Sequence, residues 1–408
     1  MKKIGTLMLA LLVLMVGLDI LMNPLRVSAE MKTLKIGRMA ALTGGGASWG
    51  IPIVKTSQCY WDLVNQKGGL EVAGERYKVE LVIYDDKYSI GEARSIAEKL
   101  IFRDKVKYIT GPMGTPTTQV VAPYCDENKV IMIGEAAGTP LNQHSFHGIR
   151  GSSQASMVLC MGIAQKHPEW KRFACMGPDD ATGWKQTADD IQFINEVCKG
   201  QVVALEFFPR GTKDFYPLLT KLRATNPDVV MTDGAATVEQ AMLMKQAAEL
   251  GWKTNWANHG MYDVNVMLGV APKEAIEGAI SNAVIHEPPD APKEILDWKE
   301  KYIARHGQFD ETSIMWYTPC AFLEATFRKA KSIAVEDFLA SAENLGKFKS
   351  LLGEAYLGGK ARRGWNHGVC EPITYTQIRD GNLSVFAKIP AIDPPAFKLY
   401  PPAKPEGK

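Results

Sequence analysis

The chain lacks several features that would point to particular classes of protein. Its 408 residues carry 47 lysines and arginines against 45 acidic residues, so there is no basic excess for binding nucleic acid or an anionic membrane surface. A GxSxG elbow, an HExxH motif, a complete GxGxxG loop and the kinase motif set are all missing. We therefore expect neither a nucleic-acid-binding protein nor an enzyme, and we assign no catalytic residue and no cofactor.

Paired or regularly spaced cysteines are also missing. The chain has seven cysteines, but none forms a CxxC pair, and no clustered Cys/His spacing suggests a zinc site. Export would favour disulfides, but most of these cysteines lie in apolar or helical stretches, where a thiol packs as a small hydrophobic side chain. The sequence favours buried free thiols and predicts no metal site.

Long hydrophobic runs are scarce, and the one at the N-terminus resembles a targeting signal. Lys2-Lys3 precede an apolar stretch over residues 4–18, and Val27-Ser28-Ala29 follows it. This order is typical of a secretory signal peptide, here residues 1–29, cleaved after Ala29. The apolar stretch is short for a membrane span, although an uncleaved anchor is the alternative.

The rest of the chain alternates between strand-like and helix-like patterns in two successive series. Strands are predicted at 34–40, 77–86 and 129–134 in the first series, and at 172–177, 202–208 and 228–234 in the second. Helical periodicity separates these strands. Such alternation predicts an α/β fold of two Rossmann-like lobes, each with a parallel sheet covered by helices.

The end of the chain follows another pattern. Residues 373–389 alternate as a β-hairpin, with Asp380-Gly381 in the turn. Residues 391–408 are rich in proline, which predicts an extended C-terminal tail on the surface.

One strand–helix junction is a candidate anion site. Residues 106–123 read VKYITGPMGTPTTQVVAP, so a short strand runs into glycines and hydroxyls just before a helix. Such a junction presents free backbone N–H groups and the positive end of the helix dipole. It suits a phosphate, a carboxylate or only the helix's own cap. No lysine follows the glycines, which disfavours a phosphate-binding loop.

Several phrases, in order and spacing, resemble the type I periplasmic binding proteins, and in particular the leucine/isoleucine/valine-binding proteins of ABC importers. The resemblance covers about residues 33–390. The matching phrases are LKIGRMAALTGGGASWG, NQKGG, VELVIYDD, ARSIAEKLI, GPMGTPTTQVVAP, VIMIGEAAGTP, GPDDATGW, GTKDFYPLLTKLRATNPDVV and QAAELGWKT.

The resemblance implies a Venus-flytrap fold, in which two lobes are joined by a three-segment hinge and ligand lies between them. The hinge crossings are expected near residues 147–152, 279–285 and 356–360. Lobe one would comprise residues 30–149 plus 283–357, and lobe two residues 150–282 plus 358–390.

In lobe one, the resemblance places the ligand carboxylate at Thr115, flanked by Gly114. The alternative is that Thr115 or Thr117 only caps the helix. Ala136-Ala137-Gly138-Thr139 matches the family's second contact segment, with the Ala136 backbone and the Thr139 hydroxyl as candidates and a loop or cap threonine as the alternative. Trp49 matches a cleft aromatic, since an indole offers a flat apolar face and one N–H donor; packing at a helix start is the alternative.

In lobe two, the sequence departs from the family at several candidate positions. Thr182 in GPDDATGW stands where relatives often have a tyrosine, and the loop containing Asp233 and Ala236 also lacks one. Amino-acid binders place a carboxylate where this chain has His259 or Gly260, to meet the α-ammonium of the ligand. His259 at a strand end is a candidate donor to the ligand, and a solvated loop histidine is the alternative.

These departures shape the expected ligand. Burying an ammonium without a partner is costly, so we expect a small carboxylate with an apolar or aromatic body rather than a branched-chain amino acid. This expectation would be reversed if Asp233, or an acid from another loop, supplied the carboxylate that pairs with an α-ammonium. Tyr262 is a further aromatic candidate, beside an ordinary packing role.

The function implied by the resemblance is that of a monomeric periplasmic solute-binding protein. It would capture an amino acid or an aromatic or aliphatic acid and deliver it to the permease subunits of an ABC transporter. An extracytoplasmic sensor that presents a small molecule to a receptor uses the same fold and is the alternative. A secreted enzyme is disfavoured, because the paired acids Asp85-Asp86 and Asp179-Asp180 read as strand-end and loop carboxylates.

Overall fold

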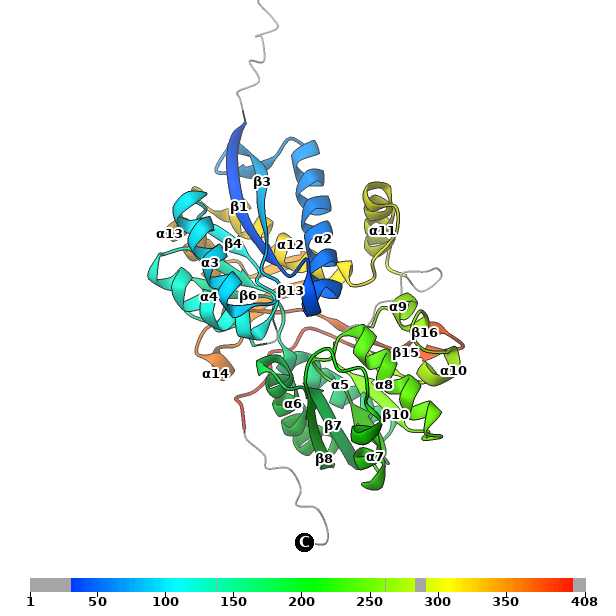
Figure 1. Ribbon diagram of the computed structural model, residues 1–408. Coiled ribbons are helices and arrows are strands. Elements are labelled where there is room, and N and C mark those ends of the chain that lie inside the picture. Colours follow the sequence, from blue (N-terminus) through cyan, green and yellow to red (C-terminus); the bar gives the residue numbers. More distant parts are fainter. Residues whose placement is uncertain (1–30, 137, 261, 283–290, 399–408) are drawn as a thin grey trace, which may run out of the picture.

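The computed structural model describes residues 31–136, 138–260, 262–282 and 291–398, and it contains two lobes stacked one above the other (Figure 1). Four predicted features lie outside these residues: the signal peptide with its cleavage site, Ala137, the end of the second crossing, and the tail beyond residue 398. Within the described residues, no helix has the length and apolar character needed to cross a membrane.

The first lobe is built on a nine-stranded sheet in the order β12-β13-β14-β6-β5-β4-β1-β3-β2. Its inner pairs are parallel, and β2, β12 and β13 pair antiparallel at the edges. The strands are β1 (Lys32–Ala40), β2 (Leu70–Val72), β3 (Glu75–Asp85), β4 (Tyr108–Thr110), β5 (Ile131–Gly134), β6 (Ser145–Arg150), β12 (Lys347–Ser350), β13 (Gly353–Gly358) and β14 (Gly368–Cys370).

Helices cover both faces of this sheet. One apolar cluster packs against α2 (Ala47–Gln66), α11 (Lys293–His306), α12 (Ser313–Lys329) and α13 (Val335–Glu343). A second cluster packs against α3 (Ile90–Glu98) and α4 (Thr115–Glu127). The sheet is therefore buried on both sides, as parallel sheets require.

The second lobe has a seven-stranded sheet in the order β16-β15-β11-β10-β9-β7-β8. Its strands are β7 (Arg172–Pro178), β8 (Gln201–Phe208), β9 (Val229–Met231), β10 (Asn255–Asn258), β11 (Ile280–Ser281), β15 (Ile373–Arg379) and β16 (Asn382–Ile389). Its helices are α5 (Ser152–Lys166), α6 (Ala181–Phe193), α7 (Tyr216–Ala224), α8 (Thr237–Glu249), α9 (Val264–Leu268) and α10 (Lys273–Ile276). One apolar cluster again lies on each face.

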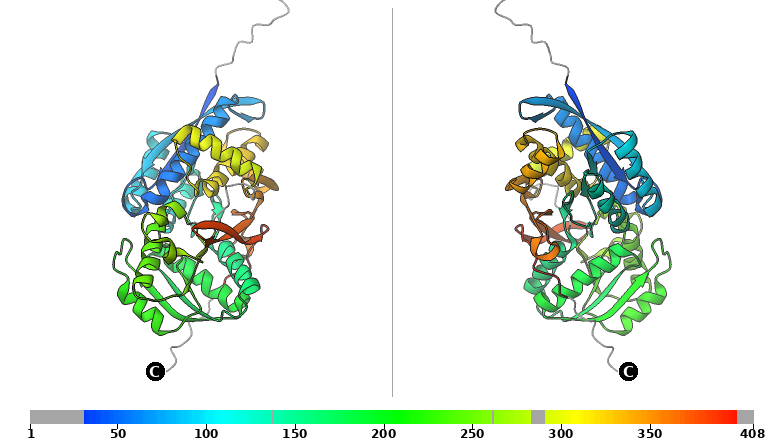
Figure 2. Two further views of the ribbon diagram at one scale, coloured as in Figure 1. Left: turned by 90° about the vertical axis from the view of Figure 1, so that its right-hand side faces the viewer. Right: turned by 90° about the vertical axis from the view of Figure 1, so that its left-hand side faces the viewer.

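The predicted α/β fold with two parallel-sheet lobes is confirmed. The predicted C-terminal hairpin is also present as β15 and β16, and Asp380 and Gly381 both take positive φ values, 53° and 74°, in its turn. Figure 2 shows this hairpin, in red, at the upper edge of the lower lobe. All seven cysteines are free and buried, as their apolar settings predicted.

The third crossing does not lie where we expected it. Residues 356–360 were predicted to lead into lobe two, but β14 pairs with β13 and β6 in the sheet of lobe one. The chain first turns through α14 (Lys360–Arg363), which is bounded by glycines at positive φ, and it crosses only after Cys370. β14 has only three residues, too few to show a strand period, so the sequence pattern did not predict it.

The proline-rich tail is more closely anchored than a free surface tail. Residues 391–398 form no helix or strand, but the carboxylate of Asp393 accepts a hydrogen bond from the backbone N–H of Gly359. The carbonyl of Pro395 accepts from Arg362, and the backbone N–H of Lys398 donates to Gln192. This part of the tail therefore connects α14 with α6.

Candidate functional site

A cavity of about 120 Å³ lies between the two lobes. An engineered protein cavity of about 150 Å³ holds benzene, so this volume suits a small solute. Most of its walls come from the ends of strands β1, β3, β4, β5 and β6 of lobe one and β7, β9 and β10 of lobe two, or from the segments that follow them, and the start of α12 completes them. Ligands of open α/β sheets bind at these carboxyl ends of strands.

The start of α4 forms part of the lobe-one wall. The Thr115 hydroxyl accepts a hydrogen bond from the Gly138 N–H at 3.1 Å, and the Thr115 N–H donates to the Thr182 hydroxyl of lobe two at 3.3 Å. The Thr117 hydroxyl donates back to the Gly114 carbonyl. Thr115 thus joins two loops and both lobes, in addition to lining the cavity.

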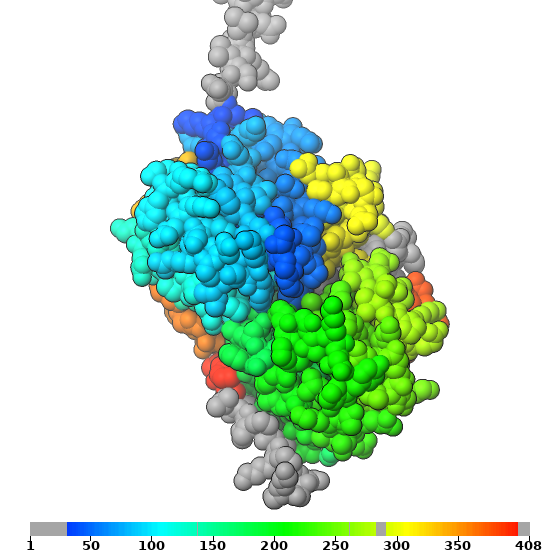
Figure 3. Space-filling view, viewed as in Figure 1, coloured from blue at the N-terminus to red at the C-terminus, as the bar shows by residue number. Residues whose placement is uncertain are grey.

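Two aromatic rings close over the cavity from lobe one. Trp49 and Tyr88 have ring centroids 6.5 Å apart, and both line the cavity. The Tyr88 hydroxyl lies 3.0 Å from that of Thr182, and the Arg210 guanidinium of lobe two lies 5.3 Å and 5.2 Å from the two ring centroids. Asp180 holds Arg210 through two hydrogen bonds. On the face shown in Figure 3, blue lobe-one residues abut green lobe-two residues.

Charged side chains at the cavity are few and already paired. Glu135 is the one acidic residue among the described lining residues, and both its oxygens accept from Arg38, at 2.7 Å and 2.8 Å. Burial raises the pKa of Glu135, against the opposing effect of Arg38. Arg150 is the lining guanidinium, and it faces Glu371 at 3.4 Å. No described lining carboxylate is thus left for an ammonium.

In lobe two, two buried carboxyls stand behind His259. The His259 Nδ1 atom lies 3.1 Å from Oδ1 of Asp190 and 3.4 Å from Oδ1 of Asp233, and the His259 backbone N–H donates to Asp233. Burial raises the pKa of Asp190 to about 7, and burial together with Asp190 raises the pKa of Asp233 well above its usual value. Burial lowers the pKa of His259.

The same three side chains are the group of potential metal ligands in the part of the chain that the structure describes. Asp190, Asp233 and His259 each offer one ligand atom, all within 4.8 Å of one another. Ser156 and the His259 backbone already donate to the Oδ1 atoms, and the raised pKa of both carboxyls favours a shared proton over a cation. We therefore interpret the group as a polar core that orients His259.

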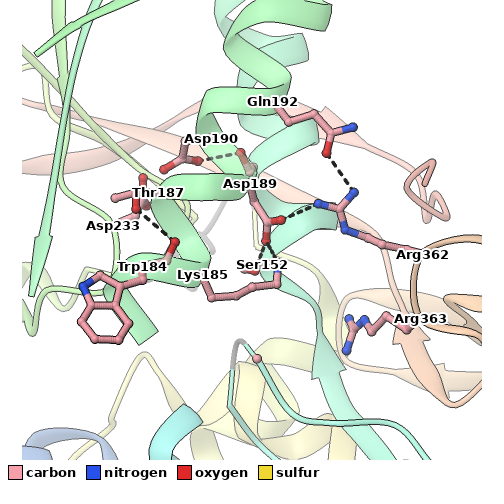
Figure 4. A network of polar contacts seen from close by, with 12 residues as sticks. Ser152, Trp184, Lys185, Thr187, Asp189, Asp190, Gln192, Asp233, Arg362 and Arg363 are labelled. Carbon is pink, nitrogen blue, oxygen red and sulfur yellow. Dashed lines mark hydrogen bonds and ion pairs between the residues drawn. The ribbon is translucent and has the colours of Figure 1, made fainter. Parts of the chain in front are cut away.

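A buried polar network joins the lobes beside the hinge. Figure 4 shows Asp189 of α6 facing Lys185, Ser152 and Arg362, and Arg362 also reaching Gln192. Burial acts to raise the pKa of Asp189, but the two cations and the hydroxyl hold that pKa below its usual value. Since Arg362 belongs to α14, between two strands of the lobe-one sheet, the Asp189–Arg362 ion pair crosses between lobes.

The structure brings seven predicted site residues to the cavity. They are Trp49, Gly114, Thr115, Ala136, Thr182, His259 and Gly260. Their contact with a ligand stays a prediction.

Five other predicted site residues do not line the cavity. Thr139 bonds to the Ala136 backbone, and Gly138 donates to Thr115. Asp233 lies behind His259, Ala236 begins α8, and Tyr262 is fully buried in the core of lobe two. Tyr262 thus has the ordinary packing role, and Asp233 does not fill the vacant acidic position.

Sequence reasoning missed several lining residues. Tyr88, Arg150, Gln240, Asn258 and Trp316 come to the cavity from separate strand ends and helices. Arg150 carried a usable signal, since it is a charged residue at the end of a strand and precedes a glycine. The others had no local pattern that separates them from surface or core residues.

A larger groove of about 510 Å³ lies on the outside of lobe one. Its lining combines uncharged side chains of α2 with charged side chains of α11, α12, β12 and the β2–β3 region. The cavity between the lobes is the stronger candidate, because its lining is mostly apolar and comes largely from strand ends of both lobes.

Comparison with known proteins agrees with this architecture. A family model described as "Periplasmic binding protein" matches residues 33–382. The Leu/Ile/Val-binding protein of Citrobacter freundii is 26% identical over 256 residues, which covers 61% of this chain and 67% of that protein. The first curated relatives are matched over only 58–67% of their own length.

Two solved structures share the fold. The leucine binding protein LivK from Thermotoga maritima has a TM-score of 0.74 at 20% identity, with 88% of this chain and 99% of that chain covered. A solute binding protein of an ABC transporter from Rhodopseudomonas palustris BisB5, in complex with 3,4-dihydroxybenzoic acid, has a TM-score of 0.72 at 22% identity, with 89% and 99% covered. At these identities the likeness concerns the fold.

Proposed function

The chain belongs to the periplasmic binding protein family, and from that premise we propose that it captures a small solute between its lobes and delivers it to the permease of an ABC importer. The observation that carries this proposal is the cavity between the two lobes, lined largely by strand ends of both. Closure of two lobes around a ligand is a hinge motion that couples binding to shape. A permease can then distinguish the loaded from the unloaded form.

The proposed ligand is a small carboxylate with an apolar or aromatic body. Trp49, Tyr88 and Trp316 supply flat apolar faces around the cavity. Glu135 is engaged by Arg38, so an α-ammonium would be buried without a partner, at a cost of about several kcal/mol. One structural neighbour is a leucine binding protein and another holds 3,4-dihydroxybenzoic acid, so both ligand classes occur on this fold.

A melting-temperature screen tests the function and the ligand class together. Leucine, valine and phenylalanine are compared with 4-methylpentanoate, benzoate and 3-phenylpropanoate in one buffer. A ligand that binds only the native state stabilises it by about 2.7 kcal/mol at a hundredfold excess over Kd, which raises the melting temperature by about 5 °C. We expect the shift with an acid that lacks the amine. A shift with leucine but not with 4-methylpentanoate would contradict the ligand class.

Hinge closure is tested by small-angle X-ray scattering with the acid that gives the largest melting shift. The radius of gyration of a monomer should fall on saturation, because closed contacts are made only with ligand bound. Unchanged dimensions at saturation would contradict closure, and a doubled mass would contradict the monomer.

We place the protein in the periplasm, as its family name indicates, with cleavage after Ala29. Mass spectrometry of the protein recovered from its native compartment should give a chain that begins at Glu30. A chain that keeps Met1 or carries a lipid would contradict this.

A further inference from the structure

Arg150 occupies a junction between the cavity and the hinge. It is the last residue of β6, from which the chain passes to α5 in the other lobe, and it lines the cavity. Its side chain is 3% exposed. A guanidinium cannot be deprotonated in a protein, so the positive charge stays at this position at every working pH.

The donors of Arg150 are poorly satisfied by the described residues. Its single hydrogen bond runs from Nη1 to Glu371 at 3.4 Å, and its Nε atom is buried without a partner. Arg38 is another buried guanidinium of lobe one, and its Nε atom also has no partner among the described residues, but its two terminal nitrogens bind both oxygens of Glu135 at 2.7 Å and 2.8 Å. Two buried arginines thus differ in one respect: Arg38 has a matched bidentate partner and Arg150 does not.

Glu371 does not hold Arg150 tightly. Its side chain is 0% exposed, and it accepts a shorter hydrogen bond, 2.8 Å, from the Thr318 hydroxyl of α12. Its backbone carbonyl accepts from Gln154 of α5. Glu371 is therefore fixed by lobe-one and lobe-two neighbours, while the guanidinium keeps donors that no described residue uses.

We infer that Arg150 is the residue that receives the anionic group of the ligand, so that the cavity selects anions. A planar guanidinium matches a carboxylate through paired N–H donors, and such charge-assisted bonds are the strong ones. Thr115 is the weaker candidate, because its N–H already donates to Thr182 and its hydroxyl, which accepts from the Gly138 N–H, has a single neutral O–H donor to give, whereas Arg150 brings a charge and paired donors. This inference rests on the proposed solute-binding function and adds the partner of the carboxylate.

The position of Arg150 also links the ligand to the hinge. Arg150 stands where the first crossing begins and Glu371 where the third begins, so an anion that draws the guanidinium away from Glu371 changes a contact between hinge segments. Ligand anion and Glu371 therefore compete for one cation.

The test compares charged probes with neutral ones of the same shape. Benzoate, 3-phenylpropanoate and 4-methylpentanoate are titrated by calorimetry beside benzamide, 3-phenylpropanamide and 4-methylpentanamide. Arg150→Met alone would leave Glu371 buried and unpaired, so the variant is the pair Arg150→Met with Glu371→Gln. Its circular dichroism and melting temperature report that it folds.

We expect the wild-type protein to prefer the best acid to its amide, and the double variant to lose about 10- to 100-fold in affinity for the acid, the range for hydrogen bonds to a charged group. Affinity for the amide should stay unchanged. Glu371→Gln alone should bind the acid more tightly, because the competitor is removed. The control is Arg172→Met, which removes a half-buried guanidinium at the start of β7 and should leave both affinities unchanged.

The outcomes separate this inference from the proposed function. Equal loss of acid and amide binding in the double variant, or unchanged acid binding, overturns the role of Arg150 while solute binding stands. If none of the six probes nor the amino acids of the melting screen binds the wild-type protein, both the proposed function and the inference are overturned.

Discussion

The two lobes meet the cavity with different chemistry. Lobe one contributes aromatic faces, the start of α4 and a glutamate already bound by Arg38. Lobe two contributes amide and imidazole side chains, with three buried aspartates standing behind them. Those aspartates, Asp189, Asp190 and Asp233, are engaged by cations, hydroxyls and His259. Lobe two is therefore rich in acid without offering any to the ligand.

The lobes nevertheless share one construction. In lobe one, a Cβ on Gly50 of α2 would lie 1.8 Å from the carbonyl oxygen of Ala41, after β1. In lobe two, a Cβ on Gly183 of α6 would lie 2.0 Å from the carbonyl oxygen of Pro178, at the end of β7. Glycine is required at both positions, since only a bare Cα permits this approach. Both lobes thus pack the start of a helix tightly against the end of a strand. They differ in the side chains that they present to the cavity.

The largest expected effect comes from the buried ion network through which Asp189 of lobe two joins lobe one. Asp189→Asn leaves Lys185 and Arg362 without their carboxylate, and breaking a buried ion pair costs about 3–5 kcal/mol of unfolding free energy. Urea unfolding measures it. The control Asp297→Asn removes an exposed carboxylate paired with Lys293 and should leave the midpoint unchanged. Equal urea midpoints for the two variants would show that the ion pairs of Asp189 do not stabilise the fold.

The acid pair behind His259 should make lobe two sensitive to pH. Because burial raises the pKa of Asp190 from 3.8 to about 7, the native state holds a proton that the unfolded state has released between those values. Stability therefore falls as pH rises through this window, by up to about 1 kcal/mol per pH unit. Asp190→Asn should flatten that decline.

Unfolding by urea between pH 5 and pH 8 measures the slope for the wild type and for Asp190→Asn. A chelator such as EDTA should change neither curve, because we interpret the group as proton-sharing. A chelator-induced loss of stability would instead indicate a bound cation, and identical slopes would contradict the raised pKa.

In lobe one, a smaller effect is expected at the start of α4. Thr115→Val keeps the shape but removes the acceptor for the Gly138 N–H, at a cost of about 1 kcal/mol in ligand affinity. Calorimetry with the best acid from the screen measures it. Thr118→Val is the control, since its hydroxyl bonds within α4, away from the cavity. If Thr115→Val lost as much affinity for the acid as the Arg150 double variant, Thr115 rather than Arg150 would be the partner of the ligand carboxylate.

The smallest effect concerns the contact between the lobes at the mouth of the cavity. Tyr88→Phe removes the hydroxyl that lies 3.0 Å from that of Thr182 and keeps the ring beside Trp49. We expect a loss of about 0.5–1 kcal/mol in affinity and a slightly more open unliganded form by scattering. Tyr84→Phe, whose hydroxyl bonds to Asp104 within lobe one, should change neither. Unchanged scattering for Tyr88→Phe would show that the contact between the Tyr88 and Thr182 hydroxyls does not hold the lobes together.

Local patterns in the sequence predicted most of the fold correctly. Strand and helix periods and the Asp380-Gly381 turn identified both lobes and the final hairpin. They failed at β14, a strand of three residues whose membership in the first sheet depends on pairing with β6 and β13. Short strands carry too few side chains to display a period, so distant pairing decides them.

The sequence by itself determined the fold class and some of the segments that reach the cavity, because burial along a helix or strand is a local, periodic property. Only the tertiary structure decided which polar groups are already engaged. Arg362 and Asp189 stand 173 residues apart, and Arg150 and Glu371 stand 221 residues apart. Such distant residues decide whether a buried charge has well-placed partners, as Asp189 has, or poorly placed ones, as Arg150 has. A hydrogen bond requires proximity in space, so the spacing of residues along the sequence does not reveal it.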